Sequence, residues 1–388
     1  MNVVFDRTST AMRADKVKTP KRRRRVAMVL AALTLVAAVG AGALWLTAES
    51  GVAFFKTEAA ETRYRAAYEA VLAKWPVAYE AITVPTSLGA THVIASGPED
   101  APPLVLLPAA MATATVWRPN VEALSAHFRV YAVDTVGQGG RSVASRKIES
   151  RRDYAAWLNE LFDGLGIARA SIVGNSYGGF IALNQALMAP ERVDRVVLIS
   201  PPGLVSYMPL FRSMVYWMLT GALRRAFGAN DGPRRDLVAI IAHPVGFNEE
   251  DNDWLALGRL LMDGSQRINM IMPEVFSDAE LGAIKTPTLL LIAEHEILYE
   301  PYSTLRTTMT RMPGLEGEIV LGAHHLAAMS KPDVVNARIV SFLQADQRKA
   351  EDSSRLVVSR GSTDGAPCTS SGRVATELHR IPQNSCKN

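Results

Sequence analysis

A serine between two glycines is the feature of this 388-residue sequence that points most directly to chemistry. Gly174, Ser176 and Gly178 have the spacing Gly-x-Ser-x-Gly, directly after residues 171–173, which predict a strand, and at the start of a predicted helix. Glycines on both sides allow a sharp, strained turn that leaves the serine hydroxyl exposed. Ser176 is therefore the candidate nucleophile, and a glycine-rich turn without chemistry is the alternative interpretation.

The residue after this serine supplies a second chemical group. The N–H of Tyr177 lies at the amino terminus of the predicted helix, where backbone donors lack partners within the helix and the dipole is positive. Such a donor stabilises the oxyanion that forms when a hydroxyl group attacks a carbonyl group. We therefore expect the Tyr177 N–H to form one half of an oxyanion hole.

A serine hydroxyl needs a base to take its proton, and an acid must orient that base. Of the seven histidines, His324 and His325 follow a short predicted strand, residues 319–321, and precede the last predicted helix, residues 332–343. This position predicts a loop on the same edge as Ser176. The alternative is that the two histidines only cap the final helix.

Strands and helices alternate along the part of the chain that must position these residues. Apolar runs predict strands, and segments with helical spacing follow several of them. The predicted strands are residues 81–84, 92–95, 104–107, 130–133, 171–173, 196–199, 288–292 and 319–321, and the predicted helices are residues 58–75, 117–128, 154–165, 180–188 and 332–343. This alternation indicates an α/β fold with a mostly parallel sheet, whose ligands bind at the carboxyl ends of the strands.

The segment around the two histidines resembles a family motif. Residues 322–326, Gly-Ala-His-His-Leu, and residues 331–336, Lys-Pro-Asp-Val-Val-Asn, are similar to the Gly-x-Gly-His segment of α/β hydrolases and the Pro and Val that follow it. Residues from about 102 to 343 resemble this superfamily, in particular its small bacterial carboxylesterases. The resemblance implies that His325 is the base and that His324 takes the usual place of a glycine; His324 as the base is the alternative.

The same resemblance implies an acid and a second oxyanion donor. Residues 293–298 resemble the family stretch Gly-Glu-x-Asp-x-Ile, in which the second acid orients the histidine; this selects Glu296, with Glu294 as the alternative. Relatives carry His-Gly after an earlier strand, where this chain has Pro108 and Ala109, so the backbone N–H of Ala110 is the expected donor. The turn at residues 134–142, which begins with Asp134, resembles a structural turn of the family.

The implied fold is an α/β-hydrolase fold, with a mostly parallel central sheet, helices on both faces and an inserted helical cap. The implied activity is hydrolysis of a small, apolar carboxylic ester through an acyl-enzyme, without a metal or organic cofactor. Acyl transfer, perhydrolysis, carbon–carbon bond hydrolysis and peptide cleavage use the same triad, and a catalytically silent binding module is a further alternative. The Met- and aromatic-rich residues 207–227 either line an acyl pocket or form the core of the cap.

The net charge of +4 does not indicate a nucleic-acid partner, because much of the positive charge lies in residues 21–25 and nearby N-terminal positions. Residues 26–46 after it are apolar and uncharged, and about 20 such residues span a bilayer. They predict a single membrane anchor, with the catalytic domain outside the cytoplasm. The alternatives are a signal peptide cleaved near residues 41–43, which would give a secreted enzyme, and a buried helix.

These observations predict a division of the chain into segments. The fraction of hydrophobic residues, 48%, and of charged residues, 21%, is typical of a globular protein. We expect a basic N-terminal segment (1–25), an anchor or signal segment (26–48), a helical lead-in (49–80), the first part of the core (81–200), a helical cap (201–281), the second part of the core (282–345) and a tail (346–388). The two cysteines, Cys368 and Cys386, lie in the tail and either pair or remain free thiols.

Overall fold

The computed structural model of the chain describes residues 54–205, 252–266 and 268–345. These residues form a sheet of nine strands in the order β1-β2-β4-β3-β6-β7-β8-β9, with β5 paired to β2. The strands are β1 (Tyr79–Thr86), β2 (Gly89–Ser96), β3 (Pro103–Leu107), β4 (Arg129–Val133), β5 (Val143–Ala144), β6 (Ala170–Asn175), β7 (Val193–Ile199), β8 (Thr288–His295) and β9 (Glu316–His324). The strands β4, β3, β6, β7, β8 and β9 pair in parallel, whereas β1, β2 and β5 join the sheet antiparallel.

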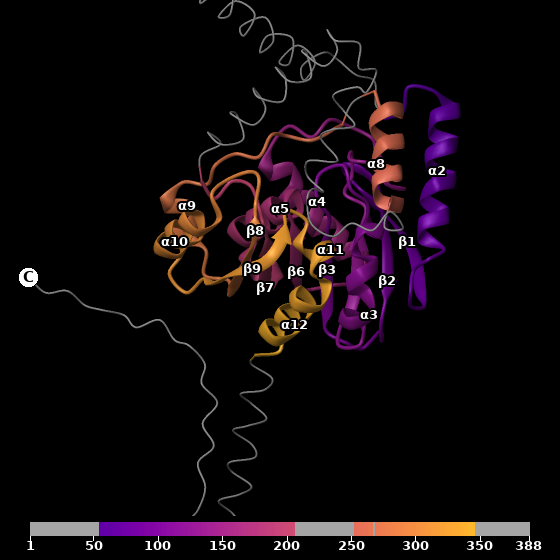
Figure 1. Cartoon of the computed structure of the whole chain (residues 1–388). Coiled ribbons are helices and arrows are strands. Elements are labelled where there is room, and N and C mark those ends of the chain that lie inside the picture. The colour runs from indigo at the N-terminus through magenta and orange to yellow at the C-terminus, as the bar shows by residue number, and fades with distance from the viewer. Residues whose placement is uncertain (1–53, 206–251, 267, 346–388) are drawn as a thin grey trace, which may run out of the picture. The chain divides into compact units, whose positions relative to one another are not determined.

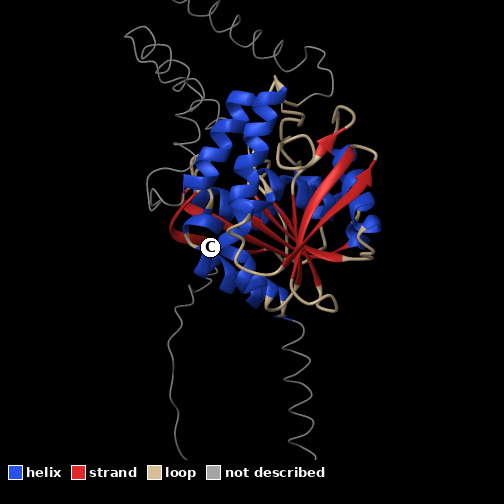
Figure 2. Cartoon of the chain, turned by 90° about the vertical axis from the view of Figure 1, so that its right-hand side faces the viewer, coloured by secondary structure: helices blue, strands red, loops and turns tan. Residues whose placement is uncertain are grey.

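Helices cover both faces of this sheet (Figure 1, Figure 2). The α-helices are α2 (Glu58–Leu72), α3 (Arg118–Ser125), α4 (Arg151–Gly164), α5 (Tyr177–Met188), α8 (Asn252–Gly264), α9 (Asp278–Ala283), α10 (Pro301–Arg311), α11 (Ala327–Ser330) and α12 (Pro332–Leu343). The short 3-10 helices are η1 (Ala114–Trp117) and η2 (Pro190–Arg192). The parallel strands connected through helices confirm the predicted fold class.

The central strands are apolar on both sides because both sides are covered. Along β3, Leu104 and Leu106 belong to the hydrophobic cluster that includes residues of α2, α3, α8 and α12, and Val105 and Leu107 belong to the cluster that includes residues of α4 and α5. Successive side chains of a strand point to opposite faces, so a continuous apolar run fills two cores. This sheet provides the rigid support for the loops at its carboxyl edge.

The N-terminal helix α2 is part of the domain. It packs along α8, which lies far away in the sequence (Figure 1). The backbone N–H of Lys56 donates to the Gly264 carbonyl oxygen at 2.8 Å, and the Tyr64 and Tyr68 side chains are buried. The helix ends at Leu72, before the predicted end at residue 75, and α2 contributes a wall of the domain instead of only leading to it.

Differences from the predicted elements have local causes. Helix α4 begins at Arg151, earlier than the predicted residue 154, because the Ser150 side chain and Asp153 form a capping box. The predicted helix over residues 117–128 is split into η1 and α3, with Pro119 in the first turn of α3. Helices α9, α10 and α11 and strand β5 were not predicted.

The predicted membrane location is corrected. Among the described residues, no helix combines the length and the apolar character needed to cross a bilayer, and this finding overturns the predicted membrane anchor. The segment on which that prediction rested, residues 26–48, lies outside the described residues, as do residues 1–25, most of the predicted cap and the tail with its two cysteines. The division into segments stays a prediction.

Candidate active site

Ser176 lies in the turn between β6 and α5 in a strained backbone conformation. Its φ of 49° and ψ of −117° fall in a region that residues other than glycine rarely adopt. Its N–H donates to the Ile199 carbonyl oxygen at 2.8 Å, which ties the turn to β7. A β-carbon on Gly174 would lie 2.3 Å from the Gly178 carbonyl oxygen, and one on Gly178 would lie 2.2 Å from the Leu107 carbonyl oxygen. The turn therefore requires both glycines.

Short contacts join Ser176 to His325 and His325 to Glu296. Ser176 Oγ lies 2.8 Å from His325 Nε2, and His325 Nδ1 lies 2.8 and 2.9 Å from the two carboxylate oxygens of Glu296. Because an ionised carboxylate only accepts hydrogen bonds, Nδ1 carries the proton and Nε2 accepts from the serine hydroxyl. The structure thus brings these three predicted residues into one relay.

The Glu296 carboxylate is buried, with 0% of its side chain exposed, and it is held by several donors. It accepts hydrogen bonds from the backbone N–H groups of Ile297 at 2.8 Å and Leu298 at 2.9 Å. Burial raises the pKa of Glu296, but the charge of His325 and the hydrogen bonds from His325 and Leu298 outweigh burial and lower the pKa below its usual value. Glu296 is therefore ionised near neutral pH and fixes the tautomer of His325.

The two alternative residues face other groups. Glu294 Oε2 accepts a hydrogen bond from the Gly322 N–H at 2.7 Å, and Nδ1 of His324 accepts one from the Leu326 N–H at 3.3 Å. Burial lowers the pKa of His324 to about 4, and the charge of His325 contributes to this shift. The geometry joins neither residue to Ser176.

The two predicted oxyanion donors lie on separate elements next to Ser176. Tyr177 is the first residue of α5, and its ring is fixed because its hydroxyl donates to the Ile271 carbonyl oxygen at 2.7 Å. Ala110 lies in the loop after β3, where none of the described residues accepts a hydrogen bond from its N–H. The next residue, Met111, has a φ of 58° and donates its N–H to Gln138 Oε1 at 3.2 Å. This left-handed residue lets the loop turn although it lacks the family's glycine.

A cavity of about 70 Å³ lies beside the nucleophile. Its wall combines the loop after β3, the side chains of Ser176 and His325 and one face of α8; the lining residues are Ala109, Ala110, Met111, Ser176, Trp254, Gly258, Met262, His325 and Leu326. Most of these side chains are apolar, so an alkyl group fits the cavity better than a charged group. Within the described residues, no group of three or more His, Cys, Asp or Glu side chains is arranged to hold a metal ion.

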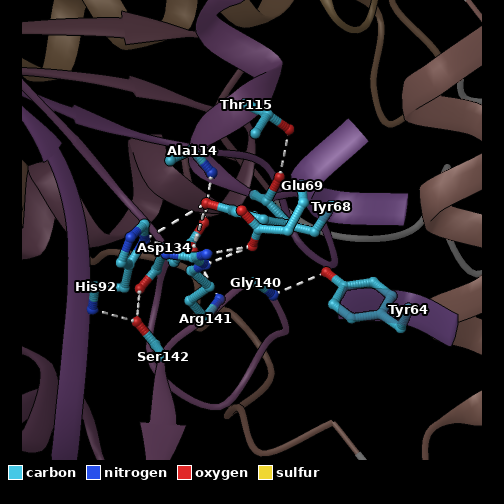
Figure 3. A network of polar contacts seen from close by, with 11 residues as sticks. Tyr64, Tyr68, Glu69, His92, Ala114, Thr115, Asp134, Gly140, Arg141 and Ser142 are labelled. Atoms are coloured by element: carbon cyan, nitrogen blue, oxygen red, sulfur yellow. Dashed lines mark hydrogen bonds and ion pairs between the residues drawn. The ribbon is translucent and has the colours of Figure 1, made fainter. Parts of the chain in front are cut away.

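A second histidine–carboxylate pair, His92 and Asp134, does not line this cavity; Figure 3 shows its contacts. Asp134 Oδ2 lies 3.1 Å from His92 Nδ1 and accepts from the Tyr68 hydroxyl at 2.9 Å. The same carboxylate accepts from the backbone N–H groups of Ala114 at 2.7 Å and Arg141 at 2.8 Å. The Asp134 carboxylate thus connects α2, β2 and η1 to the turn after β4 through these contacts, in agreement with the structural role expected from the sequence.

Residues 102–236 match the family described as the alpha/beta hydrolase fold. The chain is 35% identical over 292 residues to the uncharacterized carboxylesterase nap of Bacillus subtilis, an alignment that covers 73% of this chain and 93% of that protein. The chain belongs to the α/β-hydrolase family. The predicted resemblance and enzyme class are confirmed, and the chain is a carboxylesterase-like α/β hydrolase.

Solved structures of this α/β-hydrolase family show the same arrangement of elements. The carboxylesterase CesB (YbfK) from Bacillus subtilis is 36% identical, with a TM-score of 0.65 over 73% of this chain and 98% of that chain. The naproxen esterase (carboxylesterase NP) from Bacillus subtilis is 32% identical, with a TM-score of 0.66 over 74% of this chain and 99% of that chain. Both similarities cover most of the described domain.

The sequence pointed to the three residues that the structure brings together but missed part of the cavity wall. Trp254, Gly258 and Met262 of α8 line the cavity, although the only part of the cap expected to line a pocket was residues 207–227. Their spacing of four residues places them on one face of a helix, which is the signal that was available. The predicted pocket segment, residues 207–227, lies outside the described residues.

Proposed function

We propose that this α/β hydrolase cleaves carboxylic esters through an acyl-enzyme on Ser176, with His325 as the base and Glu296 as the acid that orients it. The unbroken relay from Ser176 Oγ to His325 Nε2 at 2.8 Å and from His325 Nδ1 to Glu296 at 2.8 Å is the observation that carries this proposal. The substrate is a small-molecule ester with an apolar group. The carboxylesterase relatives from Bacillus subtilis support the same reaction class.

In the first half of the reaction, Ser176 Oγ attacks the ester carbonyl carbon while its proton moves to His325 Nε2. The carbonyl oxygen becomes an oxyanion that accepts hydrogen bonds from the N–H groups of Tyr177 and Ala110, and the N-terminal end of α5 favours its charge. Glu296 stabilises the imidazolium that forms. The imidazolium then gives its proton to the departing alcohol oxygen, and the acyl group remains on Ser176.

In the second half, a water molecule replaces the alcohol. His325 Nε2 takes a proton from the water, whose oxygen attacks the acyl carbon and forms a second oxyanion at the same two N–H groups. The proton returns from His325 to Ser176 Oγ as the acyl bond breaks. The carboxylic acid leaves, and the relay regains its starting protonation without an external reductant or cofactor.

The test compares the parent and Ser176→Ala as full-length chains in the hydrolysis of p-nitrophenyl acetate and butyrate. We expect Ser176→Ala to lower kcat/KM by about 10⁴-fold or more, because the remaining groups lack a nucleophile. Ser303→Ala, at an exposed serine of α10, is the matched control and should retain parental activity. A Ser176→Ala variant as active as the parent would overturn the proposal, and a parent that cleaves peptides but no ester would overturn the ester assignment.

A further inference from the structure

Helix α8 forms one wall of the cavity beside Ser176, and the middle residue of that wall is a glycine. Trp254, Gly258 and Met262 are spaced by four residues, which places them on one face of the helix. All three line the cavity that also contains Ser176 and His325. The face of α8 is therefore in direct reach of a group bound at the nucleophile.

The backbone does not explain why residue 258 is a glycine. Glycine is disfavoured in the interior of a helix, yet Gly258 lies in the interior of α8 (Asn252–Gly264) without a left-handed φ, and no described atom lies within 4 Å of where its β-carbon would be. Gly264 of the same helix differs, because its β-carbon would lie 3.2 Å from Ala60 Cβ. Gly264 permits close packing against α2, whereas Gly258 leaves space.

That space is small and belongs to the cavity. Gly258 is buried, it lines the cavity, and none of the described atoms lies on its side-chain side, so the missing side chain leaves room inside the cavity. The cavity volume is about 70 Å³, less than half the volume of an apolar cavity of about 150 Å³ that binds benzene. A short alkyl group fits this cavity better than a long one, and a branched side chain at position 258 would fill most of the volume.

We propose that Gly258 sets the size of the alkyl group that this enzyme accepts next to the ester bond, and that a short group is preferred. The inference rests on the proposed ester hydrolysis at Ser176. The alkyl group belongs either to the acid or to the alcohol of the ester, and the chemistry of recognition is the same for both. Gly258 is a specificity-determining residue and takes no part in the proton relay.

The experiment measures kcat/KM of the full-length parent, Gly258→Ala and Gly258→Val in two series of esters. One series varies the acid at constant alcohol, from p-nitrophenyl acetate to butyrate and hexanoate; the other varies the alcohol at constant acid, from methyl acetate to butyl acetate. We expect Gly258→Val to lower the ratio of long-chain to short-chain kcat/KM by about tenfold or more in one series, with a smaller decrease in Gly258→Ala. The affected series identifies which side of the ester lies against α8. Ala256→Val, on the exposed side of α8, is the matched control and should keep the parental ratios.

Unchanged ratios in both series for Gly258→Val would overturn the inference, and so would an equal loss on every ester, because a pocket that selects by size spares the smallest group. Gly258→Ala should also raise the Tm by about 2–4 °C, because alanine favours the helix and its methyl group enters open space. A lower Tm would show that protein atoms already fill this space and would contradict the inference. Ser176→Ala is assayed in parallel: parental activity in that variant overturns the proposed function, a result distinct from a failure of the Gly258 variants.

Discussion

Two buried histidine–carboxylate pairs in the described domain differ in the hydroxyl group that completes them. His325 lies 2.8 Å from Glu296 on one side and 2.8 Å from the Ser176 hydroxyl on the other. This serine stands on a strained turn and lines a cavity. In the proposed reaction, a proton moves along this line of three groups from the Ser176 hydroxyl to His325.

In the second pair, His92 and Asp134 lie 3.1 Å apart, and the hydroxyl is the Tyr68 phenol, 2.9 Å from Asp134. None of these three residues lines the cavity beside Ser176. Burial, and then the charge of Asp134, raise the pKa of Tyr68 well above its usual value, so the phenol stays a donor. The comparison teaches that a histidine beside a carboxylate becomes catalytic only when it faces an accessible nucleophile.

Removing the charge of the first pair should have the largest effect. Glu296→Gln should lower kcat by about 10⁴-fold, because an amide neither fixes the productive tautomer of His325 nor stabilises its positive charge. Glu294→Gln, two residues before Glu296 and at the end of β8, is the matched control, since the Glu294 carboxylate accepts from the Gly322 N–H. Steady-state kinetics on p-nitrophenyl acetate measure both. Retention of more than a tenth of parental kcat in Glu296→Gln would remove Glu296 from the relay.

The same change in the second pair should affect stability instead. Asp134→Asn should lower the free energy of unfolding by about 3 kcal/mol, because an amide cannot accept from the Ala114, Arg141 and Tyr68 donors together. Urea unfolding measures the loss, and kcat per folded chain should stay within about tenfold of the parent. A loss of kcat as large as that of Glu296→Gln, at unchanged stability, would show that the second pair is also catalytic and would contradict its structural role.

His324, next to the first pair, should make the stability of the protein depend on pH, because burial and the charge of His325 lower its pKa to about 4. Between pH 6.5, the usual pKa of histidine, and pH 4, the unfolded chain binds a proton that the folded chain does not, so stability falls as the pH falls. From pH 7 to pH 5 this contribution amounts to about 2 kcal/mol. Urea unfolding at both pH values measures this in the parent and in His324→Gln. The free energy of unfolding should decrease by about 2 kcal/mol less in the variant than in the parent. An equal decrease in both would show that the His324 ring does not lie in an apolar environment.

The smallest effect is expected for Tyr68→Phe, which removes one donor of the second pair and keeps the ring. The variant should lose about 1 kcal/mol of unfolding free energy, because Asp134 keeps its backbone donors. Activity should not change. Tyr302→Phe, at an exposed tyrosine, is the control. A loss of activity in Tyr68→Phe at full stability would connect this network to the chemistry.

The core of the fold and the serine turn were predictable because short sequence patterns identify them. Gly174 is required by a contact within the turn and Gly178 by the close approach of Leu107 at the end of β3, and apolar runs such as residues 104–107 identify strands covered on both faces. Helix α10 was missed because its sequence contains several threonines, which have low helix propensity; its Pro301 at the first turn was the remaining signal.

The partners of Ser176 were less determined by the sequence. Neighbouring residues of an extended segment point in different directions, and only the resemblance favoured His325 over His324 and Glu296 over Glu294. The wall formed by α8 was missed, since Gly258 and Ser176, far apart in the sequence, line the same cavity only because of how the chain folds. The membrane location was inferred from one apolar segment, and this inference was wrong.

The most direct measurement of the central claim identifies the residue that a fluorophosphonate modifies. The full-length chain is treated with the reagent, digested and analysed by mass spectrometry, alongside His325→Gln. We predict one modification per chain, on Ser176, and loss of the reaction in His325→Gln, because the serine then lacks its base. Modification of a different residue, or undiminished modification of Ser176 in His325→Gln, would contradict the relay.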